Sequence, residues 1–260
     1  AHEKHLPIFV LGHGSNVVIS DNGFHGLVIK MEISGIEIIE ESDHAVSVRV
    51  QAGLKWDEFV GYTVTNGWWG IENMSLIPGT VGACPVQNVG AYGQECKYII
   101  LKISAYDISE KKFLSINNKD CRFGFIESIF NTTHKDRYII ISVDFLLSKI
   151  PVPCLSRPEI RKGLINCSIH RNLQLEIRDL VIRHRTSGKS LPNSDYIGSA
   201  GTFYRTTVVT LRQLIKTSIR SLIRLGPKTA GVILVFGWKY RNFQGYRVPS
   251  RMLIDACGAS

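Results

Sequence analysis

Short apolar runs, separated by glycine and proline, open the chain and predict strands. Ile8 to Leu11 lies between Pro7 and Gly12, as a buried strand entering a tight turn does. Residues 45–51 alternate apolar and polar side chains, the pattern of a half-buried strand. These patterns predict strands at 8–11, 17–19, 27–31, 45–51, 99–106 and 138–147.

A helical period appears at three places. Trp56, Phe59, Val60, Thr63 and Val64 share one face of a helix that Asn66-Gly67 ends. A second helix is predicted over 173–184, with Leu173, Ile177, Leu180 and Val181 inward. A third runs from the N-cap Thr210 to Leu225, before Gly226-Pro227. Because helices and strands mix without strict alternation, an α+β fold is expected.

Composition describes an ordinary folded protein with excess positive charge. The 260 residues are 44% hydrophobic and 20% charged, with a net charge of +9. We interpret the basic residues as a scattered, solvated surface. The densest basic stretch, Arg178 to Lys189, lacks the interleaved aromatic residues of a nucleic-acid groove, so no nucleic-acid partner is predicted.

The spacing of the cysteines and the length of the apolar runs indicate the cellular compartment of the protein. The six cysteines form no CxxC pair, which argues against a zinc site or a disulfide framework and favours a reducing cytoplasm. No apolar run reaches the roughly 18 residues that a bilayer span needs, so no membrane insertion is expected.

The first candidate site follows the first predicted strand. Glycines remove Cβ atoms, so that successive backbone N–H groups can converge on an anion such as a phosphate. An ordinary strand-to-strand turn is the commoner explanation of such a segment alone, and Val17 in place of a third glycine excludes a Rossmann fingerprint. The candidate cofactor-binding residues here are Gly12, His13, Gly14, Ser15 and Asn16.

The second candidate site is a loop between residues 77 and 93, rich in glycine, proline and small side chains. Such a loop lets a flat, phosphate-linked ligand lie against the backbone, and its amides can hydrogen-bond that ligand. A tight structural turn needs fewer glycines, so a binding function is favoured. The candidate cofactor-binding residues are Pro78, Gly79, Thr80, Gly82, Ala83, Gln87, Asn88 and Gly90.

Together these segments resemble the UDP-N-acetylenolpyruvoylglucosamine reductases (the MurB family), which have a Gly-Gly-Gly-Ser-Asn-like turn and an Ile-Pro-Gly-Thr-Val-Gly-Ala block. The resemblance extends over nearly the whole chain. It continues through the segments 70–73, 121–130, 185–192, 198–203 and 248–255.

The resemblance implies a fold and a division into parts. The expected fold is the two-lobed FAD-binding fold (PCMH/MurB-like), followed by an α+β substrate domain that is incomplete at its C-terminus. Residues 1–31 would be a remnant of the first FAD-binding lobe, 32–188 the second lobe, and 189–260 the substrate domain.

The resemblance also implies an activity: FAD, with NADPH as reductant, reduces UDP-N-acetylglucosamine enolpyruvate to UDP-N-acetylmuramate in peptidoglycan precursor synthesis. The partner is then a small UDP-sugar enolpyruvyl ether, and a cytoplasmic monomer is expected. Tyr92, Lys189 and Arg205 match substrate-binding positions, although Lys189 is as well explained as a solvent-exposed lysine. Thr202 stands where the family has its proton donor.

The chain departs from the family pattern at Ile126. Relatives carry there an arginine that steadies the anionic intermediate, and isoleucine has neither charge nor donor. A strand–helix portion at the N-terminus and a C-terminal glutamate of the family also lie outside residues 1–260. Both ends therefore look cut, and an exposed sheet edge with apolar surface is expected.

Two alternatives stay open beside the reductase. One is a relative that keeps the FAD-binding fold and has lost the reaction, for which Ile126 is the strongest feature. The other is a basic nucleic-acid-binding protein, which predicts steeply salt-dependent binding.

Overall fold

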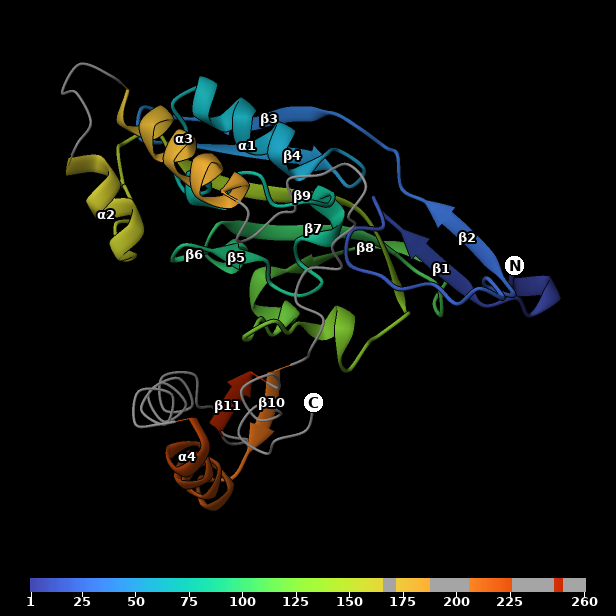
Figure 1. The fold of residues 1–260 in the computed structure, drawn as a ribbon. Helices are drawn as coiled ribbons and strands as arrows, with labels where there is room; N and C mark the ends of the chain where they lie inside the picture. Colours follow the sequence, from blue (N-terminus) through green and yellow to red (C-terminus); the bar gives the residue numbers. More distant parts are fainter. Residues whose placement is uncertain (166–171, 188–205, 226–245, 250–260) are drawn as a thin grey trace. The chain divides into compact units, whose positions relative to one another are not determined.

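The computed structural model describes residues 1–165, 172–187, 206–225 and 246–249 (Figure 1). Contacts divide the chain into two units, Ala1–Ala200 and Gly201–Ser260, called here the first and the second unit. Helices and strands mix in the first unit without regular alternation. The expected α+β class is therefore confirmed.

A five-stranded antiparallel sheet organises the first unit (Figure 1). The strands predicted at 45–51, 99–106 and 138–147 are confirmed to within one residue at either end, and two edge strands were not predicted. In spatial order the strands are β3 (Ile36–Glu41), β4 (Ala45–Gln51), β9 (Tyr138–Ser148), β7 (Ile100–Asp107) and β8 (Lys112–Asn117).

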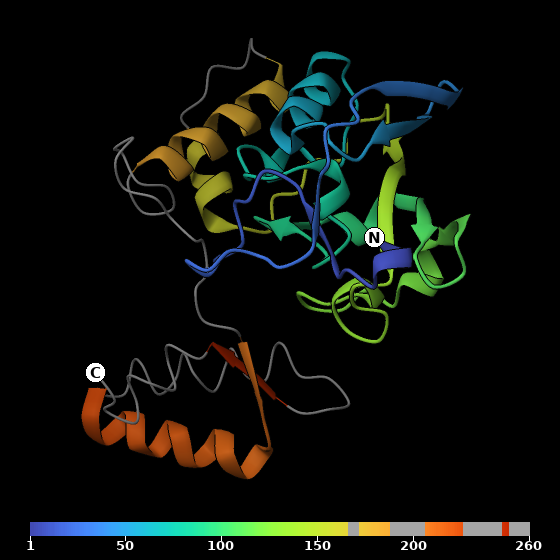
Figure 2. The same ribbon diagram turned by 90° about the vertical axis from the view of Figure 1, so that its right-hand side faces the viewer.

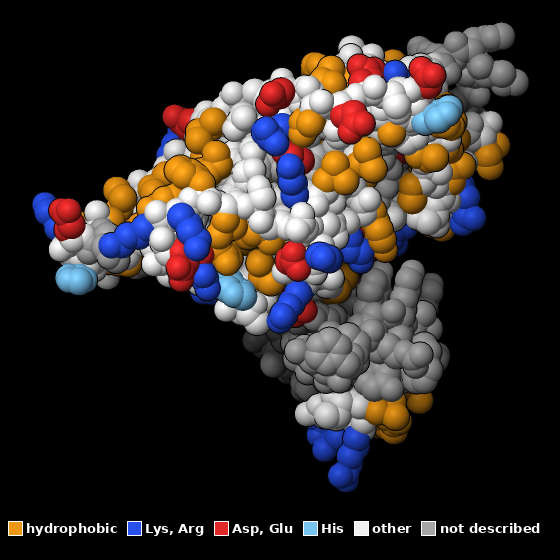
Figure 3. All heavy atoms as spheres, turned by 180° about the vertical axis from the view of Figure 1, so that it is seen from behind, with side chains coloured by type: hydrophobic (Ala, Val, Ile, Leu, Met, Phe, Trp, Pro, Cys, Tyr) orange, Lys and Arg blue, Asp and Glu red, His pale blue; other side chains and the backbone are white. Residues whose placement is uncertain are grey.

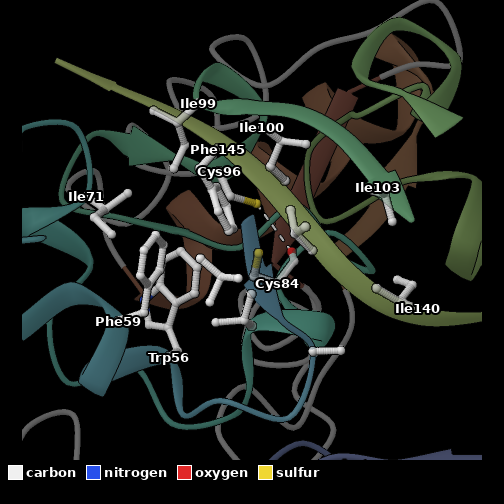
Figure 4. Close-up of a cluster of buried hydrophobic side chains, with 14 of the residues drawn as sticks. Trp56, Phe59, Ile71, Cys84, Cys96, Ile99, Ile100, Ile103, Ile140 and Phe145 are labelled. Atoms are coloured by element: carbon white, nitrogen blue, oxygen red, sulfur yellow. Dashed lines mark hydrogen bonds between the residues drawn. The ribbon is translucent and has the colours of Figure 1, made fainter. Parts of the chain in front are cut away.

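Helix α1 (Trp56–Thr65) packs on this sheet through the face that the sequence predicted. The rings of Trp56 and Phe59 lie 6.3 and 4.9 Å from the ring of Phe145 on β9 (Figure 4). All three side chains are fully buried. This aromatic cluster fixes α1 relative to β9, and the second candidate loop is anchored at the start of α1.

Helices α3 (Leu173–Thr186) and α2 (Pro158–Ile165) follow β9. In α3, Ile177 and Val181 are buried as predicted, but the inward position of Leu173 is wrong, since it is exposed. Gln174 is buried in its place, because its Nε2 donates to the carbonyl oxygen of Trp68 at 2.6 Å. A buried hydrogen bond therefore sets the rotation of the first turn.

An ion pair joins α1 to α3. Arg178 donates two hydrogen bonds, of 2.7 and 2.8 Å, to the two carboxylate oxygens of Asp57. Burial by itself raises the pKa of Asp57, but the hydrogen bonds from Arg178 and from the backbone N–H of Leu76 outweigh it, and the pKa is lowered. The carboxylate thus stays charged and clamps the two helices.

Strands β1 (Ile8–Leu11) and β2 (Leu27–Lys30) form a separate two-stranded parallel sheet (Figure 2). The strand predicted at 17–19 is wrong: this segment has no paired strand beside it. Leu27 and Val28 are exposed on β2.

The second unit contains β10 (Thr206–Val209) and β11 (Tyr246–Pro249), paired antiparallel, and helix α4 (Leu211–Leu225). The predicted N-cap is confirmed, because Thr210 Oγ1 accepts a hydrogen bond from the backbone N–H of Gln213 at 3.3 Å. The side chain of Gln213 in turn accepts from the backbone N–H of Thr210 at 2.8 Å. This reciprocal pair is a capping box.

Cys84, Cys96 and Cys121 are buried, and Cys96 donates a hydrogen bond to the carbonyl oxygen of Cys84 (Figure 4). Burial raises the pKa of the Cys84 thiol, and burial with the nearby Asp120 charge raises that of Cys121 to about 12. These thiols therefore stay protonated and have no nucleophilic role. Over the described residues, no cluster of side chains suits a metal ion, and no helix has the length and apolarity of a bilayer span.

Candidate functional site

The structure brings the two glycine-rich segments together. Residues 12–16, the first turn, follow β1, and residues 78–90, the second loop, follow α1. The side-chain amide of Asn16 donates to the side-chain oxygen of Gln87 at 3.1 Å, across a separation of 71 residues. The two candidate cofactor-binding segments therefore form one site.

Two close approaches hold the first turn against the second loop. A Cβ added at Gly12 would lie 2.8 Å from Thr80 Oγ1, so only glycine fits there without a shift. A Cβ added at Gly79 would lie 3.4 Å from Ser15 Oγ, and Gly79 has a φ of +121°, which side chains rarely adopt. Glycine is thus required on both sides of the junction.

Several backbone donors at this junction have no acceptor among the described residues. In the described part of the chain, no acceptor contacts the backbone N–H groups of residues 12–16, nor those of Gly79 and Thr80. Gly14 has a φ of +71°, so the first turn contains a left-handed residue. Successive donors in such a turn are the features of an anion-binding nest. The site therefore fits a phosphate-bearing cofactor.

The second loop is fastened to the core near the end of β4. The backbone N–H of Trp56 donates to the carbonyl oxygen of Gly79 at 3.0 Å, and that of Gly82 to the carbonyl oxygen of Ala52 at 2.8 Å. A Cβ added at Gly82 would lie 2.6 Å from the Cβ of Ala52. The glycine at 82 is therefore needed for packing against protein.

Asn88 is also occupied by protein groups. Its amide donates to Glu95 Oε2 at 2.7 Å and to the carbonyl oxygen of Gly124 at 2.8 Å, and its oxygen accepts from the backbone N–H of Lys97 at 3.1 Å. The side chain thus ties the second loop to the turn at 124–127. Of the other candidate cofactor-binding residues, the exposed ones are His13, Gly14, Asn16, Pro78, Ala83 and Gly90.

Ile126 lies in a tight turn beside the second loop. The Ser128 hydroxyl donates to the carbonyl oxygen of Val86 at 2.6 Å. The side-chain amide of Asn131 donates to the carbonyl oxygen of Ile126 at 3.1 Å. Ile126 has a φ of +58°, which is costly for a β-branched residue, and its side chain is 45% exposed. An uncharged side chain thus occupies a position that the turn holds close to the candidate cofactor site.

Tyr92 lies in the hairpin between β5 (Gly90–Ala91) and β6 (Gln94–Glu95). The turn residues Tyr92 and Gly93 both have positive φ, as a type I′ hairpin turn requires. The ring of Tyr92 packs edge-on against His184 of α3, at a centroid distance of 5.7 Å.

Asn73 supports this hairpin, a role that was not predicted from the sequence. Its amide donates to the carbonyl oxygens of Tyr92 at 2.9 Å and Cys154 at 2.8 Å. The preceding residue, Glu72, accepts from Gln94 Nε2 at 2.8 Å, and burial raises the pKa of its carboxyl group. The only sequence signal for this support was the match of residues 70–73 to the family.

Three candidate residues lie outside the described residues: the proton-donor position Thr202 and the substrate-binding positions Lys189 and Arg205. Their roles remain predictions.

Comparison with known proteins gives concordant matches. Residues 1–104 match the family model of an FAD binding domain. The UDP-N-acetylenolpyruvoylglucosamine reductase of Neisseria meningitidis serogroup C is 41% identical over 200 residues, which cover 76% of this chain and 57% of that protein. The reductase of the same name from Ralstonia nicotianae is 35% identical over 257 residues, covering 97% of this chain and 70% of that protein.

A solved structure shares the fold. The crystal structure of UDP-N-acetylenolpyruvylglucosamine reductase from Thermus caldophilus matches with a TM-score of 0.54 at 21% identity, covering 83% of this chain and 67% of that chain. At this identity the match supports the fold alone. The chain spans between 57% and 70% of the length of the two relatives above.

Proposed function

Because the chain belongs to the family of UDP-N-acetylenolpyruvoylglucosamine reductases, we propose that it takes part in the reaction of that family. In this reaction NADPH reduces bound FAD, and UDP-N-acetylglucosamine enolpyruvate is reduced to UDP-N-acetylmuramate for peptidoglycan precursor synthesis. The partner is thus a small UDP-sugar. We further propose a cytoplasmic monomer, in keeping with the free cysteines among the described residues.

The observation that carries the proposal is the set of backbone donors at the junction of the first turn and the second loop. Their N–H groups have no acceptor among the described residues, and glycines keep side chains away from them. A diphosphate accepts hydrogen bonds from such donors, which are uncharged backbone groups, so its binding here neutralises no charged side chain. Bound FAD supplies the hydride chemistry, and the protein has to orient it and exclude water.

The proposal divides the chain as the family resemblance does. Residues 1–31 and 32–188 would provide the two FAD-binding lobes, and 189–260 the substrate domain. Tyr92 would contact the substrate from its hairpin, and Lys189 and Arg205 would meet its phosphates. The Thr202 hydroxyl would deliver the proton, since a hydroxyl can both donate and accept a hydrogen bond.

One observation favours a second function, an FAD-binding relative without the reaction. Ile126 occupies the position of the family's arginine, in a turn that hydrogen bonds hold to the second loop. Losing one preorganised donor to a developing oxyanion costs about 10²–10³ in rate. On this account the chain keeps its cofactor site and turns over slowly or not at all.

The test has two readouts. Purified protein is examined for flavin absorption after added FAD and desalting, and then for NADPH oxidation that depends on the enolpyruvyl sugar nucleotide. Flavin retention with substrate-dependent oxidation supports the reductase. Flavin retention without oxidation, with activity raised by Ile126→Arg, supports the inactive relative. Protein that retains no flavin contradicts both.

A further inference from the structure

The net positive charge of the protein is not spread evenly over the chain. Residues 1–200 contain 21 Lys and Arg and 21 Asp and Glu, so the first unit is neutral overall. Residues 201–260 contain ten Lys and Arg and a single acidic residue, Asp255. The second unit therefore carries the entire net charge of +9 in 60 residues. Basic residues occur in both units, and the excess arises because the second unit has almost no acidic residues.

Helix α4 of this unit buries two serines and leaves several aliphatic side chains exposed. Its buried positions include Ser218 and Ser221 beside Leu214. Five of its large aliphatic side chains are exposed. They are Leu211 (46%), Ile215 (46%), Ile219 (53%), Leu222 (49%) and Ile223 (79%), called here the aliphatic stripe.

The aliphatic stripe is bordered by a row of cations. Arg212, Lys216 and Arg220 recur at intervals of four residues, so they share one side of α4, and all three are exposed. No acidic residue occurs in α4. Figure 3 shows hydrophobic and basic side chains next to each other on this helix, at the bottom of the view.

The aliphatic stripe and the row of cations together favour one class of partner over the others. A nucleic acid satisfies the cations but leaves the aliphatic stripe in water, and the described face of α4 offers no aromatic ring for base stacking. A second copy covers the stripe but brings two rows of like charges together. An anionic lipid surface covers both, since headgroups meet the cations and acyl chains meet the aliphatic side chains.

We propose that α4 binds the surface of an anionic lipid bilayer. With 15 residues, the helix is about 22 Å long, shorter than the ~30 Å hydrocarbon core, so it lies along the surface and does not span it. The aliphatic stripe enters the boundary between headgroups and acyl chains, and the cation row lies at headgroup level. This inference does not rest on the FAD site or on the reductase activity.

The test is co-sedimentation of the full 260-residue chain with vesicles. Vesicles of phosphatidylcholine alone are compared with vesicles containing phosphatidylglycerol, at low and high salt. We expect binding to the anionic vesicles that weakens with salt. Each cation near such a surface contributes about a fivefold gain in affinity, so Arg212→Gln/Lys216→Gln/Arg220→Gln should lower affinity by roughly 100-fold. Ile215→Ser/Ile219→Ser should lower it by roughly tenfold or more.

Matched variants in the first unit control for charge and for apolar surface. Lys111→Gln/Lys112→Gln/Lys119→Gln removes the same charge from exposed positions around β8, and Ile38→Ser/Ile39→Ser removes isoleucines of similar exposure from β3. Both control variants should bind the anionic vesicles as tightly as the unsubstituted protein does. Far-UV circular dichroism checks that every variant is folded.

Three outcomes would overturn the proposal. The first is absence of binding to anionic vesicles at low salt. The second is an oligomer, seen by light scattering, that the isoleucine variant in α4 dissociates while vesicle binding is unchanged. The third is binding of a single-stranded oligonucleotide that only the cation variant abolishes, without vesicle binding.

Discussion

The contact between the first turn and the second loop can be tested by substituting Gly12. A Cβ at this position would lie 2.8 Å from Thr80 Oγ1, about 0.6 Å closer than ordinary contact. Thr80 is almost fully buried and cannot move away easily, because the backbone on either side of it is hydrogen-bonded to the core. Gly12→Ala should therefore lower the free energy of unfolding by about 1–3 kcal/mol, as overpacking does.

A double-mutant cycle isolates this contact. The next atoms that the new Cβ meets are Thr80 Cγ2 at 3.5 Å and Thr80 Cβ at 3.7 Å, so Thr80→Ala removes the only conflict. Thr80→Ala alone should cost about 1 kcal/mol. In the double variant most of the Gly12→Ala cost should disappear, giving a coupling free energy of about 1 kcal/mol or more.

The assay is urea unfolding of flavin-free protein, analysed by linear extrapolation. Gly23→Ala is the matched control: nothing lies within 4 Å of its added Cβ, so only its φ of +71° contributes a cost. Its effect should add to that of Thr80→Ala. If the free-energy changes of Gly12→Ala and Thr80→Ala also add, within about 0.5 kcal/mol, the two segments do not meet and do not form one site.

Three further results are expected. Ile126→Asn should raise the free energy of unfolding by about 1 kcal/mol, because asparagine tolerates a φ of +58° better than a β-branched residue; a Tm equal to that of Ile126→Val would contradict this. Gly82→Val should destabilise the flavin-free protein by about 2 kcal/mol or more, through the conflict with Ala52; stability unchanged and flavin lost would mean that the valine meets the cofactor instead. Burial raises the pKa of Glu72, so the folded state binds more protons than the unfolded state, and the free energy of unfolding should fall as pH rises above ~4.3. Glu72→Gln should flatten this pH dependence in urea titrations. An unchanged dependence would mean that another group causes it.

Local sequence patterns predicted the elements whose buried side chains lie on one regular face of the element. The helical period from Trp56 to Val64 predicted α1 because every residue on that face is buried. The apolar run at 17–19 misled, because β-branched residues form a strand only where a neighbour accepts their hydrogen bonds. Strand β3 was missed for the opposite reason: its sequence, Ile36–Glu41, is mostly exposed at a sheet edge and lacks alternation.

The candidate site was predictable as two loops but not as one surface. Glycine content identified residues 12–16 and 78–90, while the contact between Asn16 and Gln87 depends on a fold that no local pattern encodes. The sequence also could not separate glycines that clear space for a ligand from Gly82, which clears space for Ala52. The inward turn of Asn88 was hidden likewise, since one of its partners, the carbonyl oxygen of Gly124, lies 36 residues away.

The most direct test of the central claim compares FAD with riboflavin, which lacks the diphosphate and the adenosine joined to it. Both ligands are titrated into flavin-free protein, and the dissociation constants are obtained from calorimetry or flavin fluorescence. Two charge-assisted hydrogen bonds from the backbone donors of the junction to a diphosphate are worth about 3 kcal/mol, so FAD should bind roughly 100-fold more tightly. Equal affinity for the two ligands would contradict the claim that this junction binds a diphosphate.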